Sequence, residues 1–176
     1  MAVVVKNEVK YDHFFDAQTK RHQINGVQTV LHCHHFTSLY TQLAIDSNET
    51  DLIRDCARDS FRTMLDKYFA DNPDIESIQD KIEIACQYYA LIGLGKMKVN
   101  FLGDESGEVE LLSSHTDAGW MKKWDKYDRP INYITAGYIE ALFGAILGVE
   151  GGAFEAIERQ SIVMGAETSL FNVVRR

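Results

Sequence analysis

The sequence contains few cysteines, few prolines and no long hydrophobic run. Its 176 residues include 3 cysteines and 2 prolines. The cysteines, Cys33, Cys56 and Cys86, lie far apart and form no CxxC pair, which is typical of reduced thiols in a cytoplasmic protein. The N-terminal apolar stretch, residues 2–5, is too short for a signal peptide or a membrane span and is predicted to be a strand. We therefore expect a cytoplasmic protein that does not insert into membranes.

Basic residues are also fewer than acidic residues. The chain has 18 Lys and Arg residues against 26 Asp and Glu residues, so its formal net charge is −8. Because non-specific nucleic-acid binding depends on Lys and Arg neutralising phosphates, no nucleic-acid partner is expected. The basic residues between 122 and 129 are interrupted by Asp125 and Asp128, and this segment is predicted to be a solvated loop.

Established catalytic signatures are missing as well. The sequence has no GxSxG nucleophile motif, no P-loop and no GxGxxG that follows a strand. Apolar residues make up 45% of the chain and charged residues 25%, as in ordinary globular domains. A chain of this length can bury a core without disulfides or a structural metal. The sequence therefore predicts a single domain over residues 1–176.

The first half of the chain, residues 27–95, is predicted to be helical because apolar side chains recur there at helical spacing. A first helix is expected over residues 27–46. A second helix is expected to begin at Thr50 or Asp51 and to end before Pro73. A third helix is expected over residues 75–94, where Gly95 closes it.

The pattern changes over residues 96–176, where apolar and polar residues begin to alternate. The predicted elements are strands at 96–102 and 108–113, a short amphipathic segment at 120–127, a helix at 131–147, and strands near 153–163 and 169–174. A hairpin, a helix and a second hairpin therefore follow the run of helices. This order predicts an α+β fold in which an antiparallel sheet packs against helices.

Two segments of the second half resemble a known family. Residues 133–144 read YITAGYIEALFG, and residues 161–173 read SIVMGAETSLFNV. An aromatic helix containing glycine, followed by a strand, a glycine turn and a strand ending in Phe, is similar to the 4-vinyl reductase domain. This small-molecule-binding module is related in fold to the TRAPP vesicle-tethering subunits. The resemblance implies a frequently dimeric domain with a largely apolar pocket, as in tetrapyrrole-biosynthesis proteins and sensors of aromatic effectors.

The same resemblance raises the question of a zinc site. Some members of the family bind zinc with the help of two C-terminal cysteines, whose positions here are taken by Ser161 and Ser169. Serine hydroxyls are poor zinc ligands compared with thiolates. We therefore do not expect the zinc site of those members in this chain.

Half of the six histidines lie in the tetrapeptide HCHH at residues 32–35. Residues three apart share one face of a helix, so His32 and His35 are expected to converge. That face continues through the apolar residues Phe36, Leu39 and Leu43, which predicts that both imidazoles point toward the interior.

A metal site is one interpretation of these histidines. His115 follows a predicted strand and Glu140 lies among apolar residues of the last predicted helix, so both are candidate partners for His32 and His35. Imidazole and carboxylate ligands with an open position suit a transition metal such as Zn or Fe and support metal-assisted catalysis. Two other interpretations are open: a metal-free role, in which the histidines line a ligand pocket, and a purely structural role.

The sequence predicts a pocket between the histidine helix, the strand end at His115 and the last helix. The expected ligand-binding residues are His34, His115, Trp120, Tyr133 and Tyr138. Together with the resemblance, they indicate a homodimeric small-molecule-binding domain for an aromatic or tetrapyrrole-like ligand. Two alternatives stay open at this point: a small metalloenzyme that uses His32, His35 and His115, and an assembly subunit.

Overall fold

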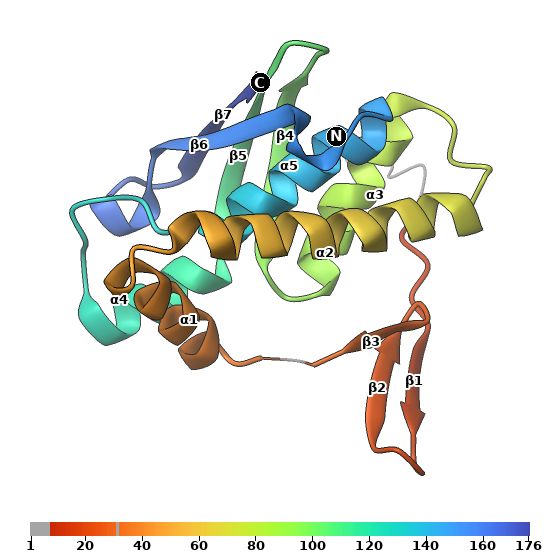
Figure 1. Cartoon of the computed structure of the whole chain (residues 1–176), viewed down its shortest axis with the longest axis horizontal. Helices are drawn as coiled ribbons and strands as arrows, with labels where there is room; N and C mark the ends of the chain where they lie inside the picture. The colour runs from red at the N-terminus through yellow and green to blue at the C-terminus, as the bar shows by residue number, and fades with distance from the viewer. Residues whose placement is uncertain (1–7, 31) are drawn as a thin grey trace, which may run out of the picture.

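The computed structural model describes residues 8–30 and 32–176. Within these residues the chain forms five α-helices and seven β-strands in two antiparallel sheets (Figure 1). This arrangement confirms the predicted α+β class. The strand predicted at residues 2–5 lies outside the described residues. No helix of the described ranges combines the length and the apolar character that are needed to cross a membrane.

A small sheet projects from the body of the molecule (Figure 1). It consists of β1 (His13–Asp16), β2 (Arg21–Ile24) and β3 (Val27–Thr29) in the order β1-β2-β3. The prediction of a helix from residue 27 is wrong at its start, because Asn25 and Gly26 have φ angles of 49° and 73° and reverse the chain. An Asn-Gly pair is the typical turn of a two-residue hairpin, and it directs the β-branched residues that follow into a strand.

Three helices follow this sheet. They are α1 (His34–Asp46), α2 (Thr50–Asp71) and α3 (Ile78–Leu91). The second and third predicted helices are confirmed with small shifts of their ends. The Ser77 hydroxyl caps α3 by accepting a hydrogen bond from the Asp80 N–H at 3.0 Å.

The main sheet contains the two predicted hairpins. Its strands are β4 (Gly95–Leu102), β5 (Ser106–Ser114), β6 (Phe154–Gln160) and β7 (Ser169–Arg175), in the order β4-β5-β7-β6. The hairpins pair with each other through β5 and β7. Between them the chain forms α4 (His115–Trp124) and α5 (Tyr133–Leu147). Two short 3₁₀ turns, Gly151–Ala153 and Ile162–Met164, flank β6.

The main core lies on both sides of α5, between the large sheet and α2 (Figure 1). Eleven of the 15 residues of α5 are buried. Tyr138 and Phe143 contact aromatic residues of α3 and β6, with ring centroids 4.9 Å from Tyr89 and 5.4 Å from Phe154 respectively. A second, smaller core forms around the fully buried Trp120, at α4.

Helix α1 has the reverse of the predicted orientation. Its apolar residues Phe36, Leu39 and Leu43, expected in the interior, are 40–54% exposed. The buried side is formed by small residues, namely Thr37, Ser38, Thr41 and Ala44. The cause is the close approach of α4, since a Cβ added at Gly119 would lie 2.5 Å from the Ser38 hydroxyl and 2.8 Å from the His34 carbonyl. Only small side chains fit between two helices this close together.

A glycine also controls how closely α5 packs on α2. A Cβ at Gly137 would overlap the backbone carbonyl oxygen of Arg54 and lie 2.8 Å from the backbone nitrogen of Arg58. We predict that Gly137→Ala lowers the free energy of unfolding by about 1–3 kcal/mol, because overpacking outweighs the better helix propensity of alanine. Urea denaturation measures this change. Gly152→Ala is the control, since nothing lies within 4 Å of its added Cβ; equal losses in the two variants would contradict the prediction.

Candidate functional site

A buried polar cluster joins four elements of the C-terminal half. Asn132, the residue that precedes α5, stands at its centre. Its side-chain Nδ2 donates to Asp117 Oδ2 at 2.9 Å and to Glu158 Oε1 at 2.9 Å. Its backbone N–H donates to Glu158 Oε2 at 3.2 Å. One asparagine thus connects a carboxylate of α4 with a carboxylate of β6.

The start of α4 supplies the other half of the cluster. Ser114, the last residue of β5, accepts a hydrogen bond from the Asp117 N–H at 3.0 Å and so caps α4. The same hydroxyl donates to Asn132 Oδ1 at 3.0 Å. Ser-x-x-Asp is a helix-start signature, so the local pairing of these two residues could be read from the sequence. The contacts with Asn132 and Glu158 could not, because they join segments far apart in the chain.

The environment of this cluster disfavours negative charge. Asp117 is 1% exposed, and burial raises its pKa to about 6, against the opposing effect of the Asn132 amide. Burial also raises the pKa of Glu158, and the Asn132 amide again opposes the change. Nearby, the Tyr89 hydroxyl is paired with Thr135 Oγ1 at 2.8 Å, and burial raises the pKa of Tyr89.

A cavity of about 260 Å³ opens beside the cluster, between α2, α5 and β6. Its lining includes two residues of the polar cluster, Asn132 and Glu158, which are called its polar end below, and the charged residues Arg54, Arg129 and Glu155. Its walls are mostly apolar. The apolar residues that line it are Pro130, Tyr133, Ala136, Ala156, Ile157 and Phe171.

A second hollow of about 360 Å³ lies between the small sheet and helices α2 and α3. Its lining contains Lys10, Lys67 and Asp71 and is more polar than that of the cavity beside Asn132. Pockets for small organic molecules are usually apolar, with a few polar groups that fix orientation. The cavity next to Asn132 fits this description better than the larger hollow does.

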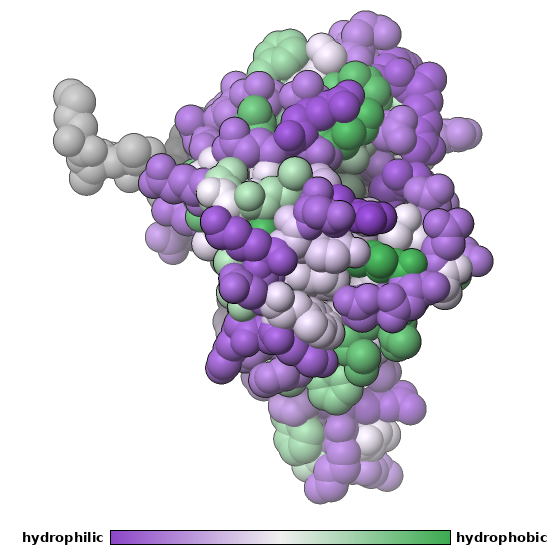
Figure 2. Space-filling view, turned by 90° about the vertical axis from the view of Figure 1, so that its left-hand side faces the viewer, coloured by the Kyte–Doolittle hydropathy of each residue, from purple (hydrophilic) through white to green (hydrophobic). Residues whose placement is uncertain are grey.

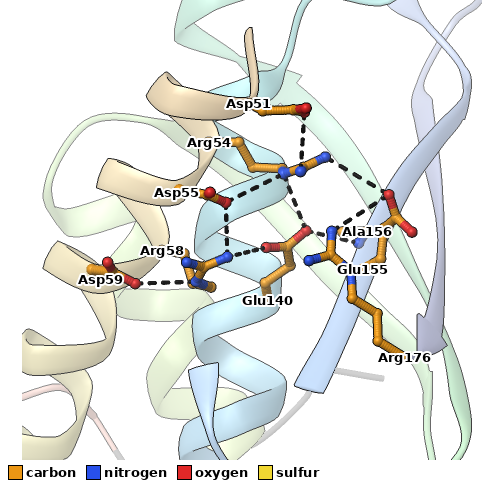
Figure 3. A network of polar contacts seen from close by, with 9 residues as sticks. All are labelled: Asp51, Arg54, Asp55, Arg58, Asp59, Glu140, Glu155, Ala156 and Arg176. Atoms are coloured by element: carbon orange, nitrogen blue, oxygen red, sulfur yellow. Dashed lines mark hydrogen bonds and ion pairs between the residues drawn. The ribbon is translucent and has the colours of Figure 1, made fainter. Parts of the chain in front are cut away.

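An ion-pair network anchors one wall of the smaller cavity (Figure 3). Glu140 of α5 is fully buried; its carboxylate accepts a hydrogen bond from the Ala156 N–H at 3.1 Å. Arg54 Nε lies 3.6 Å from Glu140 Oε1, and Arg58 Nη1 lies 3.6 Å from Oε2. Burial raises the pKa of Glu140, and the Ala156 N–H and the arginines oppose this.

The histidines predicted to form a site divide into two groups. His34 lies close to His35 and to His115, with ring centroids 4.3 Å and 6.1 Å away. His32 instead contacts Phe36 and lies outside the helix, because α1 begins only at His34. The predicted convergence of His32 and His35 on one helical face is therefore wrong. His32 and His35 are both exposed.

The three aromatic residues predicted to bind the ligand lie in different parts of the structure. Tyr133 lines the cavity next to Asn132. Trp120 and Tyr138 are fully buried in the smaller and the main core. Tyr138 donates its hydroxyl to the Ala85 carbonyl at 2.6 Å. Of the five predicted ligand-binding residues, only Tyr133 borders this cavity.

The predicted metal ligands are not gathered at one point. Glu140 is paired with arginines of α2, as described above, and not with histidines. In the two described ranges, no group of three or more His, Cys, Asp or Glu side chains is arranged to hold a metal ion. The transition-metal site stays a prediction from the sequence.

The two serines at the family's cysteine positions lie near the polar cluster. Both are buried, and Ser169 Oγ accepts a hydrogen bond from the Ile162 N–H at 3.0 Å. These residues do not fit zinc: hydroxyls replace thiolates, and the amide nitrogen of Asn132 already stands between the carboxylates as their hydrogen-bond donor.

Comparison with known proteins relates this chain to others through its fold. No protein-family model matches the sequence, and no curated protein matches it. The phenol-responsive sensory domain of the transcription activator PoxR, solved with phenol, superposes with a TM-score of 0.77 at 10% identity, over 93% of this chain and 84% of that one. A TRAPP complex subunit 3 from Naegleria fowleri, covalently bound to palmitic acid, has a TM-score of 0.53 at 12% identity, over 80% and 90%.

A vinyl-4-reductase family protein from Methanocaldococcus jannaschii superposes more weakly, with a TM-score of 0.49 at 12% identity, over 70% of this chain and 68% of that one. This chain has the α+β fold of the PoxR sensory domain and of the TRAPP subunit, which confirms the fold that the sequence resemblance implied.

The raised pKa of Asp117 predicts a specific pH dependence. Its folded value, about 6, exceeds the ordinary value of 3.8, so its contribution to stability is complete below pH 3.8 and is lost as the pH rises through about 6. Asp117→Asn should remove this loss, which amounts to about 3 kcal/mol at most. Urea unfolding between about pH 4 and pH 7 measures it.

The exposed Asp128 provides the matched control. Asp128→Asn should retain the wild-type decline in the free energy of unfolding over the same pH interval. If Asp117→Asn and wild type had parallel stability curves, the proton of Asp117 would not be linked to folding.

Proposed function

We propose that this chain is a small-molecule-binding domain and that its ligand occupies the cavity between α2, α5 and β6. The observation that carries the proposal is the pairing of apolar walls with one polar end, formed by Asn132 and Glu158. This is the usual composition of a ligand site, in which apolar area supplies affinity and a few polar groups set orientation. A reducing, cytoplasmic location is part of the proposal, since all three cysteines are free thiols.

The cavity points to a single-ring compound. Its volume, about 260 Å³, lies below the range of about 300–1,000 Å³ that is usual for drug-sized ligands. It therefore favours one aromatic ring over the larger tetrapyrrole-like ligand considered from the sequence. The side chain of Tyr133 and the small side chain of Ala136 provide a surface against which such a ring can pack.

The polar end selects for a hydrogen-bond donor on the ligand. The side-chain amide and the backbone N–H of Asn132 donate to the two carboxylate oxygens of Glu158, at 2.9 Å and 3.2 Å. The Ser161 and Ser169 hydroxyls also hydrogen-bond to this carboxylate. The amide hydrogens of Asn132 are used, whereas its carbonyl oxygen accepts from Ser114 and keeps a second lone pair. A phenolic hydroxyl or an aromatic amine would donate to this carbonyl oxygen, or to Glu158 in place of one serine. The PoxR domain, similar in fold, was solved with phenol, which makes phenol a suitable first probe.

We predict that phenol binds with a Kd below about 1 mM and that anisole, which lacks the donor, binds about tenfold more weakly. Ala136→Leu should abolish phenol binding, because its added carbons fill the cavity. Isothermal titration calorimetry or ligand-observed NMR measures each affinity.

Val27→Leu, in the other hollow, is the matched control and should leave phenol binding unchanged. Equal binding of anisole and phenol would contradict a hydrogen bond from the ligand to the polar end of the cavity. Loss of binding in Val27→Leu, with retention in Ala136→Leu, would assign phenol to the other hollow.

We propose further that the exposed side of α1 is covered by a second copy of the chain. Surface helices of monomers turn their apolar side inward, whereas α1 exposes its large apolar residues Phe36, Leu39 and Leu43. Apolar side chains reach the surface on the side of the molecule that carries α1 and α4 (Figure 2).

The spacing of the exposed residues suits a two-fold interface. Phe36, Leu39, Tyr40 and Leu43 lie symmetrically about the middle of α1. In an antiparallel pair of these helices, Phe36 of one copy would face Leu43 of the other, and the reverse would hold as well. A two-fold axis requires a self-complementary surface of this kind.

We predict that the wild-type protein sediments as a dimer and that Leu43→Glu sediments as a monomer. A buried glutamate without a partner is costly, so the interface should not tolerate it. Leu52→Glu is the control, since Leu52 is equally exposed but lies on α2. A monomeric wild type, or a dimer that survives Leu43→Glu, would contradict the proposed interface.

A further inference from the structure

Basic side chains gather where α1 begins against α4. His34 and His35 are the first two residues of α1, and His115 is the first residue of α4. The His34 ring lies 4.3 Å from the His35 ring and 6.1 Å from the His115 ring, between centroids. Lys122 lies close enough to His34 for its charge to act on that imidazole. None of these four residues lines the cavity described above.

The packing of the two helices holds this cluster together. His115, Gly119 and Lys122 are spaced by four and three residues, so they share one face of α4. Gly119 lies against His34, because a Cβ added to it would be 2.9 Å from the His34 Cβ. The imidazole of His34 is therefore held next to the stretch of α4 between His115 and Lys122.

No negative charge balances this cluster in the described parts of the chain. None of the ion pairs found there includes His34, His35, His115 or Lys122. The first turn of α1 has no acidic residue, and the Cys33 side chain does not cap it. Asp117 of α4 is held by Asn132 and does not compensate the cluster.

The His34 imidazole has a ring nitrogen without a partner. Its Nε2 atom is buried and has no hydrogen-bond partner. Burial lowers the pKa of His34, and the neighbouring His35, Lys122 and His115 lower it further. Every charged group that acts on this imidazole is thus basic. A nitrogen in this position would gain a partner and a counter-charge from a bound anion.

We propose that His34, His35, His115 and Lys122 form a binding site for a small oxyanion: a carboxylate, a sulfate or a phosphate group. Imidazolium and ammonium donors make strong, charge-assisted hydrogen bonds to such oxygens. The uncapped start of α1 adds the positive end of its helix dipole. The site is separate from the proposed aromatic cavity, so either proposal can fail without the other.

Sulfate is the first probe, because its oxygens can accept hydrogen bonds from several imidazole and ammonium donors at once. We expect sulfate to shift the imidazole signals of His34, His35 and His115 in NMR spectra of the full chain. Chloride at matched ionic strength controls for general screening.

Two lysines of α4 provide a matched pair of variants. Lys122→Gln removes a charge from the cluster and should weaken sulfate binding about tenfold. Lys123→Gln removes the same charge one residue later, but the Lys123 ammonium lies over the Trp124 ring, 4.3 Å from its centroid. This control should change the affinity less than about twofold. His115→Gln, a change at the half-buried start of α4, removes one imidazole of the cluster and should also weaken sulfate binding.

Acetate and sulfate together distinguish the source of the anion. Tighter binding of acetate, which has no aromatic ring, would identify a carboxylate ligand, and tighter binding of sulfate would identify a sulfate or phosphate group. Either result supports the site if Lys122→Gln weakens anion binding and Lys123→Gln does not. Imidazole shifts no larger than those caused by chloride, or equal losses in Lys122→Gln and Lys123→Gln, would overturn the proposal.

Discussion

A single buried carboxylate fixes how three elements of this protein meet. Glu140 lies fully buried where α2, α5 and β6 come together. A carboxylate in such a place is very costly unless its oxygens find partners. Arg54 and Arg58 of α2 and the backbone of Ala156 in β6 provide them. Each element is therefore held in one register relative to the others, and Gly137, one turn earlier on α5, makes the close approach of α2 possible.

This arrangement also positions the candidate ligand site. Arg54 contacts Glu140 on one side and the cavity on the other. Glu158 is two residues beyond Ala156 on β6, so both side chains belong to the same face of the strand. The hydrogen bond from the Ala156 N–H to Glu140 therefore also fixes the position of Glu158 relative to Asn132. The position of Glu158 at the polar end of the cavity therefore depends on the ion pairs of Glu140, although no hydrogen bond joins the two groups of residues.

Helix α1 illustrates how packing overrides hydrophobic pattern. Its apolar residues predicted an inward face that includes Phe36 and Leu43, yet those residues are exposed. Gly119 allows α4 to approach so closely that only Ser38, Thr41 and similar small residues fit between the helices. The same contact brings His34 next to His115. One glycine thus explains both the apolar surface offered to a second copy and the gathering of basic side chains beside it.

The α+β class, the two hairpins and α5 could be predicted from the sequence, because the periodicity of apolar residues and the glycine and proline signals act locally. The bounds of α4 were predicted wrongly: the helix begins at His115 and includes Lys122 and Lys123, which were expected in a loop. The sequence did not reveal β1 and β2, whose residues are mostly exposed and carry little apolar pattern. It identified Tyr133 but missed Asp117, Asn132 and Glu158. Which polar residues lose their water, and which face of α1 is buried, could be seen only in the folded chain, because both depend on contacts between segments far apart in the sequence.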